Sequence, residues 1–334
     1  MQGAMSDPQL VGALVLPSSV YCAQEAMGLT FAGRVWTTDV WFALPGLPPN
    51  ADSAPLDTPL VLTDPSGLTK GREVEVGSFA HGLQDSGKRE DLACYIRMLA
   101  FVAPTTELST SEFHDKTTLW WRGVLSWLEL WTRQRLDLDA GFPSQMSMQC
   151  LDRRASPHAS AAFGPTIYFP FSRGITAVTG AMLIEASERV ALGDLPAVQW
   201  RLLRRAERLV VRDGHQAILV AASAAEVCLA EAIRELLLGM DLDGQERIIL
   251  QANGLIGLID LLEALESAPG KSRRRRLMDR VAKPRNDAAH AGITPTPETL
   301  NMALNEIHEL LDHYTPAVPT PTKGDSPGPS PPTR

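Results

Sequence analysis

Hydrophobic and polar positions follow different patterns in the two halves of the chain. The first half holds short apolar runs separated by turn residues, which is typical of β-strands. From about Leu195 onward, apolar residues recur every three to four positions, which is the spacing of amphipathic helices. The strands predicted by the first pattern are residues 10–16, 31–44, 59–63, 72–76 and 167–171. We therefore predict an α+β fold class, in which an N-terminal mixed α/β domain (residues 1–190) precedes a C-terminal all-α bundle (residues 195–314).

One segment of the first half has helical spacing instead. In residues 115–137 the apolar positions recur as in a helix, and four of the seven tryptophans lie there. Such a helix could be an aromatic platform for bases or for a partner. We favour a helix that packs its wide face into a core, because tryptophans bury large apolar areas.

The second half predicts a bundle of helices over residues 196–212, 216–239, 254–283 and 297–314, the third interrupted near 268–270. The second helix, with the sequence ILVAASAAEVCLAEAIRELLL, is almost wholly apolar and rich in small residues. Small residues allow close helix approach, so this helix is predicted to be the central one. Its Glu226 needs a partner if it is buried. That partner could be Arg285 or an arginine of the first helix, or Glu226 could lie exposed at the edge of the bundle.

The composition is that of an ordinary globular protein, with 44% hydrophobic and 21% charged residues. No run of 18 or more apolar residues occurs, and the start of the chain lacks a basic segment, so neither a transmembrane helix nor a secretory signal is predicted. The four cysteines form no CxxC pair, which indicates a reduced, cytoplasmic protein. Residues 315–334 hold seven of the 25 prolines and are predicted to be a disordered tail.

The segment from Lys283 to Gly292, KPRNDAAHAG, carries the most chemistry. If it is helical, His290 shares a face with Asn286 and neighbours Asp287. Arg285 would lie about 140° around the helix from His290. An arginine can hold a phosphate with its planar fork, and a histidine can move a proton at neutral pH. These groups suffice for metal-free RNA cleavage, in which the 2′-OH attacks the neighbouring phosphate.

The arrangement of Arg285, Asn286 and His290 before the last helix of an all-α bundle resembles the motif of the HEPN superfamily. The small-residue helix with Glu226 resembles an early helix of many HEPN domains, and the resemblance covers residues 195–314. It implies a metal-independent endoribonuclease, acting as a toxin or as a defence or stress effector, without a cofactor. Arg285 and His290 would be catalytic and Asn286 supporting, in a cleft shared by a homodimer. The products would carry 2′,3′-cyclic phosphate and 5′-OH ends, and an antitoxin or another regulatory partner could exist.

Other interpretations stay open at this point. Some HEPN domains bind RNA or nucleotides without cutting them, and others serve as assembly modules. Arg285 and His290 could simply cap helix ends and hydrogen-bond across the bundle. The chain could also be a structural accessory protein, with the tail or the tryptophan helix as its contact surface. The first half shows no independent active site, which favours a sensing, docking or regulatory role for it.

A basic run overlaps the motif. Between Lys271 and Arg285 there are eight basic residues and one acidic residue, although the whole chain has a net charge of −8. Such a local concentration suits phosphate contacts, although a charge run is commonly a solvated helix face. We predict RNA binding by Arg273, Arg274, Arg275, Arg276, Arg280 and Lys283, with Glu226 and Asp287 supporting the site. No histidine, cysteine or carboxylate spacing predicts a metal site.

Overall fold

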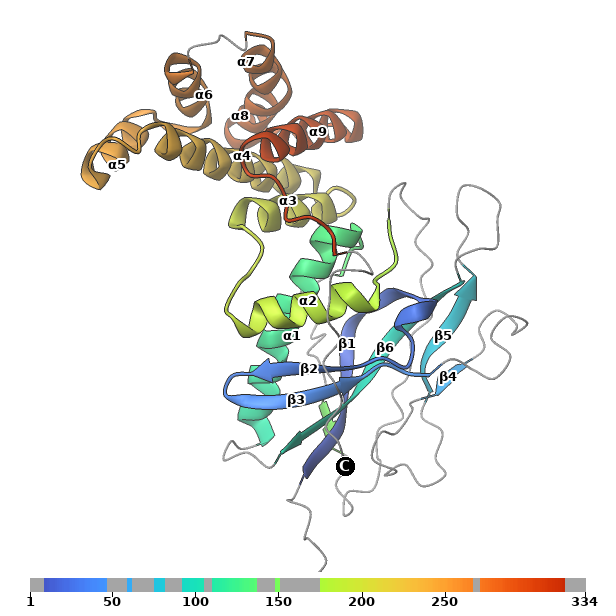
Figure 1. The fold of residues 1–334 in the computed structure, drawn as a ribbon. Helices are drawn as coiled ribbons and strands as arrows, with labels where there is room; N and C mark the ends of the chain where they lie inside the picture. The colour runs from blue at the N-terminus through green and yellow to red at the C-terminus, as the bar shows by residue number, and fades with distance from the viewer. Residues whose placement is uncertain are drawn as a thin grey trace, which may run out of the picture. The chain divides into compact units, whose positions relative to one another are not determined.

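A computed structural model describes residues 9–46, 59–61, 75–81, 92–104, 110–136, 148–150, 175–266 and 271–321. The chain divides into two compact units, and the second unit is Pro196–Pro319. In its described residues the first unit combines an antiparallel sheet with two α-helices, and the second is helical (Figure 1). The mixed α and β content predicted from the sequence is thus confirmed. Most of the tail and the predicted strand 167–171 lie outside the described residues.

The described part of the first unit contains a seven-stranded antiparallel sheet. Its path is β2-β3-β6-β1-β7, and β5 pairs with β6 and carries β4. The strands are β1 (Gln9–Ala23), β2 (Thr30–Val35), β3 (Thr38–Ala43), β4 (Pro59–Val61), β5 (Glu75–His81), β6 (Leu92–Pro104) and β7 (Met148–Cys150). The long apolar run of β6 and the short β7 were not predicted.

The predicted strand 31–44 is a hairpin of β2 and β3. The turn lies at Trp36, which has a positive φ of 59°. Buried Phe31, Gly33 and Val35 alternate with exposed residues along β2, as a strand with one face in the core requires.

The tryptophan helix packs into the core of the first unit. It is α1 (Thr110–Thr132), and α2 (Gly180–Ala191), which was not predicted, packs against both α1 and β2. Trp120 stacks on Phe42 with ring centroids 4.8 Å apart, and the four tryptophans of α1 are buried. The core interpretation is therefore confirmed, and the platform interpretation is wrong for these residues. Leu119, on the predicted apolar face, is nevertheless exposed.

Replacing Gly33 by alanine is expected to destabilise the first unit by about 1–3 kcal/mol, the usual cost of overpacking a core. A Cβ at this position would lie 2.5 Å from a ring carbon of Trp120 and 2.9 Å from one of Phe42. Neither ring can retreat easily, because the two are stacked. Chemical denaturation of wild type and Gly33→Ala measures the effect. An unchanged free energy of unfolding would contradict this packing.

The second unit is a bundle around one long helix. Its described elements are α3 (Val198–Leu209), α4 (Gly214–Leu236), α5 (Leu242–Gln251), α6 (Gly254–Leu265), α7 (Lys271–Leu277), the π-helical turn η3 (Met278–Ala282), α8 (Lys283–Ala291) and α9 (Pro297–Tyr314). The side chains of Asp213 and Thr296 cap α4 and α9 by accepting hydrogen bonds from backbone N–H groups in their first turns. The sequence pattern predicted α4 and α9 closely and missed α5.

α4 is the central helix of this bundle, as predicted. It packs against α3, α6, α8 and α9. Its buried alanines, which include Ala221, Ala222 and Ala225, let these neighbours approach closely. By length and composition α4 could cross a membrane, but most of its apolar stretch is buried in the bundle. This burial is consistent with the core helix of a soluble protein.

A polar cluster joins α3 to α9. His308 Nε2 lies 3.0 Å from Glu207 Oε1, and Arg204 donates to Glu207 Oε2 at 2.6 Å. Arg204 is itself buried. Burial alone would raise the pKa of Glu207, but the hydrogen bond from His308 and the charge of Arg204 together lower it below its usual value.

Because the folded state lowers this pKa, the Glu207 carboxylate stabilises the fold at pH values above its usual pKa of 4.5, and this contribution is lost as the pH falls through the lower folded-state pKa. Glu207→Gln is therefore expected to reduce the free energy of unfolding near neutral pH, with a deficit that shrinks on acidification. Denaturation of both proteins between neutral pH and about pH 3 measures this. A deficit that grows as the pH falls would contradict the assignment.

Candidate functional site

The predicted motif is helical, and its helix continues from the basic run. α7, η3 and α8 follow one another without a break. Pro284 has no N–H to donate to the carbonyl four residues before it, and its ring crowds that carbonyl. The helix widens just before Pro284 into the π-helical turn, where Lys283 N–H donates to the Met278 carbonyl. Because the π-helical turn has more residues per turn than an α-helix, it changes the direction in which the side chains of the motif project from α8.

α8 ends at Gly292, directly after the motif. Gly292 has a φ of 66°, a left-handed conformation that glycine adopts without strain. Its N–H donates to the Ala288 carbonyl, and the Ile293 N–H donates to the Asp287 carbonyl, both at 3.1 Å. The first of these is the hydrogen bond of the αL capping motif, with glycine as the left-handed residue. His290 therefore lies on the last turn of a well-terminated helix.

Arg285 is held by two neighbours. Its Nη1 donates to Asn286 Oδ1 at 3.1 Å, and its Nη2 lies 3.9 Å from Glu226 Oε1 on α4. The side chains of Arg285 and Glu226 are 32% and 28% exposed, so both are half-buried. Of the partners predicted for Glu226, the structure shows Arg285. Glu226 Oε1 is itself buried and accepts no hydrogen bond from the described residues, so this oxygen can accept one more hydrogen bond.

His290 is exposed on α8, and its ring has no hydrogen-bond partner among the described residues. The structure thus does not join His290 directly to Arg285, as expected for side chains about 140° apart around one helix. Asp287 is half-buried, and its backbone carbonyl, not its carboxylate, takes part in the cap of α8. Neither side chain caps a helix end among the described residues, but the pair of Arg285 with Glu226 does cross the bundle from α8 to α4.

The sequence interpretation missed His215, on the first turn of α4. Its Nε2 lies 3.0 Å from the Ala288 carbonyl, which can only accept, so this nitrogen carries the hydrogen and donates. The bond ties the start of α4 to the last turn of α8. A signal was present, because His215 and Glu226 are eleven residues apart, which is three helical turns, and so share one face of α4.

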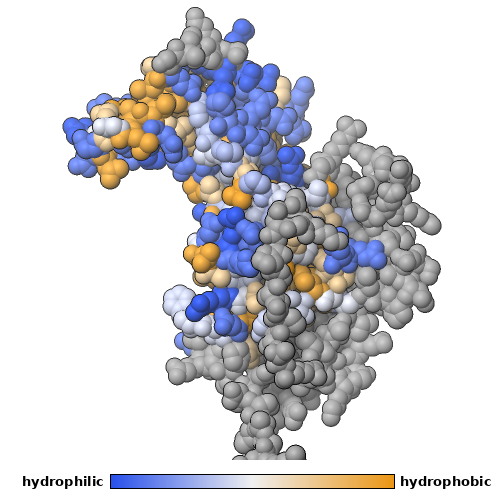
Figure 2. Space-filling model, viewed as in Figure 1, coloured by the Kyte–Doolittle hydropathy of each residue, from blue (hydrophilic) through white to orange (hydrophobic). Residues whose placement is uncertain are grey.

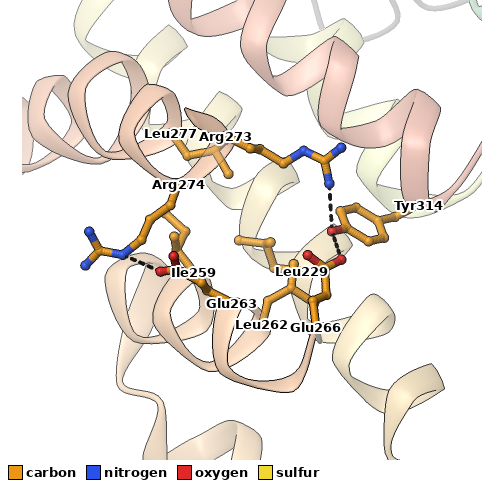
Figure 3. Close-up of a pocket in the computed structure, with 9 residues that line it drawn as sticks. All are labelled: Leu229, Ile259, Leu262, Glu263, Glu266, Arg273, Arg274, Leu277 and Tyr314. Atoms are coloured by element: carbon orange, nitrogen blue, oxygen red, sulfur yellow. Dashed lines mark hydrogen bonds and ion pairs between the residues drawn. The ribbon is translucent and has the colours of Figure 1, made fainter. Parts of the chain in front are cut away.

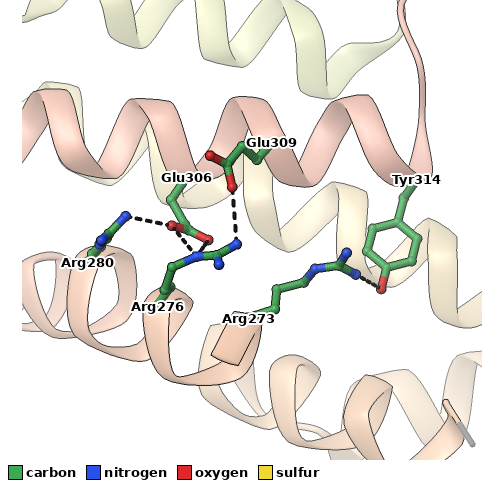
Figure 4. Close-up of polar contacts among 6 residues, drawn as sticks. All are labelled: Arg273, Arg276, Arg280, Glu306, Glu309 and Tyr314. Carbon is green, nitrogen blue, oxygen red and sulfur yellow. Dashed lines mark hydrogen bonds and ion pairs between the residues drawn. The ribbon is translucent and has the colours of Figure 1, made fainter. Parts of the chain in front are cut away.

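The basic run lies against acidic residues of the same unit. Glu306 on α9 is 1% exposed and accepts hydrogen bonds from Arg276 at 2.8 and 3.0 Å and from Arg280 at 3.2 Å (Figure 4). Arg276 also reaches Glu309 at 3.1 Å. The hydrogen bond to Glu306 raises the pKa of Arg276. These two arginines therefore link α7 and η3 to α9, a structural use that the predicted RNA-binding role did not anticipate.

Two further arginines of the run border a shallow hollow between α6, α7 and α9 (Figure 3). Arg274 pairs with Asp260 and Glu263 of α6 at 2.7 and 2.8 Å. Arg273 donates to the Tyr314 hydroxyl, which in turn donates to Glu266. Burial and the hydrogen bond to Glu266 raise the pKa of Tyr314 to about 12. The phenol therefore stays protonated at neutral pH.

Three members of the predicted RNA-binding set are exposed, and one of them, Arg280, is paired with the buried Glu306. Arg275 is 86% exposed and reaches only Asp279, at 3.6 Å, and Lys283 is exposed at the start of α8. Arg275, Lys283 and Arg285 therefore remain accessible cationic groups on the same continuous helix as His290. The accessible positive charge near the motif is thus smaller than the sequence indicated.

Within the described residues, no group of three or more histidine, cysteine, aspartate or glutamate side chains could hold a metal ion. No family model, no curated protein and no solved structure matches the chain.

Proposed function

We propose that the second unit is a HEPN-type, metal-independent endoribonuclease domain that acts as a toxin-like or defence effector. The observation that carries the proposal is the placement of two groups on α8. The His290 ring is exposed on the last turn, and the Arg285 guanidinium is half-exposed and oriented by Asn286 and Glu226. Both groups are accessible to a phosphate.

The chemistry follows from these two side chains. In the proposed reaction His290 moves a proton between the attacking 2′-OH and the leaving 5′-oxygen. Arg285 uses its remaining N–H groups to hold the scissile phosphate and stabilise the charge that develops on it. Asn286 and Glu226 act as positioning residues for the guanidinium. In the homodimer that the HEPN resemblance implies, the motifs of two chains would face one RNA.

Cleavage of mixed RNA in the presence of EDTA tests the proposal. The full-length protein is compared with the double variant Arg285→Ala/His290→Ala, and the ends of the products are analysed. We expect the wild type alone to cut and to leave 2′,3′-cyclic phosphate and 5′-OH ends. An inert wild type, or a double variant as active as the wild type, would refute the nuclease proposal.

A non-catalytic HEPN module for RNA or nucleotide binding, or for protein assembly, is the second candidate. The ion pairs of Arg274, Arg276 and Arg280 favour the assembly role, because they occupy charge that a phosphate-binding surface would leave open. An inert wild type that also fails to bind RNA in a salt titration would support assembly.

A further inference from the structure

The helix that carries Arg285 and His290 is held by little apolar packing. Of the nine residues of α8, only Ala288 is buried. The face of the second unit over α7, α8 and α9 is mostly hydrophilic, whereas hydrophobic side chains gather over the α5 end (Figure 2). A helix as short as α8 is marginal by itself in water. Its first turn continues from η3, so its last turn depends on what holds it to α4.

Two side chains of α4 reach α8. Glu226 Oε1 lies 3.9 Å from Nη2 of Arg285, in the first turn of α8. His215 Nε2 donates to the Ala288 carbonyl at 3.0 Å, toward the other end of α8. His215 and Glu226 share one face of α4, and their contacts occur in the opposite order along α8. α4 therefore holds α8 at two points, one through a side chain and one through the backbone.

The Ala288 carbonyl is the point at which the last turn of α8 is held. It accepts hydrogen bonds from His215 Nε2 at 3.0 Å and from the Gly292 N–H at 3.1 Å. A backbone carbonyl has two lone pairs, so these two donors use both. The bond from Gly292 closes the turn on itself. The bond from His215 is the one that ties the turn to another helix.

The imidazole of His290 depends on this turn for its position. It follows Ala288 by two residues, and its ring is exposed and has no hydrogen-bond partner among the described residues. A general acid or base must lie within hydrogen-bond reach of the atom that it serves. A misplacement of about 1 Å can cost about 100-fold in rate. A shift of the last turn would therefore pass directly to the imidazole.

We propose that His215 is a positioning residue for RNA cleavage, which fixes the last turn of α8 and thereby the place of His290. This inference rests on the proposed nuclease function. His215 does not itself transfer a proton in this scheme, because it is half-buried and its Nε2 hydrogen is held by the Ala288 carbonyl. Without this donor, the last turn is held by its own cap alone.

Two replacements of His215 in the full-length chain test the role. His215→Ala removes the donor, whereas His215→Gln keeps an N–H donor on a side chain of similar length. Single-turnover cleavage of an RNA oligonucleotide is measured in EDTA, and affinity is measured with the 2′-O-methyl form of that oligonucleotide, which cannot be cleaved. We expect His215→Ala to lower the cleavage rate by about 2–10-fold, the effect of one hydrogen bond, at unchanged affinity. His215→Gln should keep most of the rate, and His313→Ala is the matched histidine control.

Hydrogen exchange gives a readout that does not depend on activity. If His215 restrains the last turn, the amides of residues 284–293 should exchange faster in His215→Ala than in the wild type. Their exchange in His215→Gln should resemble that of the wild type. The amides of α9 serve as the internal control, because His215 does not hold that helix.

The possible outcomes separate this inference from the nuclease proposal. If the wild type cleaves RNA and His215→Ala cleaves it equally fast, or if His215→Gln is as slow as His215→Ala, the positioning role is wrong. A loss of about 100-fold or more in both variants would make His215 a proton-transfer group, which also overturns the proposal. A loss confined to affinity would assign His215 to RNA binding instead. An inert wild type would refute the nuclease proposal and this role with it, even if exchange confirms the contact.

Discussion

His290→Ala is expected to lower the rate of RNA cleavage by about 10²–10⁴-fold, the usual contribution of a positioned general acid or base. The loss should fall on the catalytic rate and leave RNA binding nearly intact, because the exposed ring of His290 holds no other part of the fold. Single-turnover cleavage and a separate binding titration distinguish the two effects. A His290→Ala protein that retains full activity would show that the motif is not catalytic.

Controls for this experiment come from the same unit. His313 is exposed on α9, and His313→Ala should cleave as wild type does. Arg285→Ala should lose about 10²–10³-fold, as expected for removal of one charged donor to the developing anion. Arg285→Lys should restore only part of this loss, because an ammonium lacks the planar fork. Arg201→Ala is the matched arginine control, since Arg201 is exposed on α3 and belongs to neither the motif nor the basic run.

The sequence predicted those elements whose pattern is local. The helices α4 and α9 have long apolar faces and recognisable caps, and the tryptophan helix α1 has a wide apolar face. β6 was missed because a continuous apolar run does not distinguish a strand from a buried helix. α5 was missed because its apolar residues are largely exposed and follow no core-facing stripe.

For the candidate site, the sequence left open whether the motif is helical, and it named the partner of Glu226 among its alternatives. It did not predict the contacts of the basic run, because their acidic partners lie up to 33 residues away on α9. Eight basic residues among fifteen look the same in sequence whether they face a nucleic acid or a buried glutamate. The π-helical turn was also missed, because Pro284 permits either a helix start or a local widening.

Removing the two arginines that hold Glu306 is expected to be the most destabilising change in the second unit. Glu306 is 1% exposed, and the described groups that pair with it are Arg276 and Arg280. Arg276→Ala/Arg280→Ala would leave a buried carboxylate without a cation, which costs about 3–5 kcal/mol in comparable pairs. Chemical denaturation, monitored by helical content, measures the loss.

Removing Glu306 instead should destabilise the protein less. This difference would identify the unpaired buried carboxylate as the cause of the instability of the double arginine variant. In Glu306→Leu the two arginines lose their buried partner, but they are 38% and 44% exposed and can be hydrated. Adding Glu306→Leu to the double arginine variant removes the buried charge and should recover much of the lost stability, since an apolar residue can replace a buried ion pair at little cost. If the triple variant were as unstable as the double variant, the stability would come from packing of the arginine stems. In that case the methylene groups of the two arginines would stabilise the fold by packing. Their guanidinium groups would then be available to bind a phosphate.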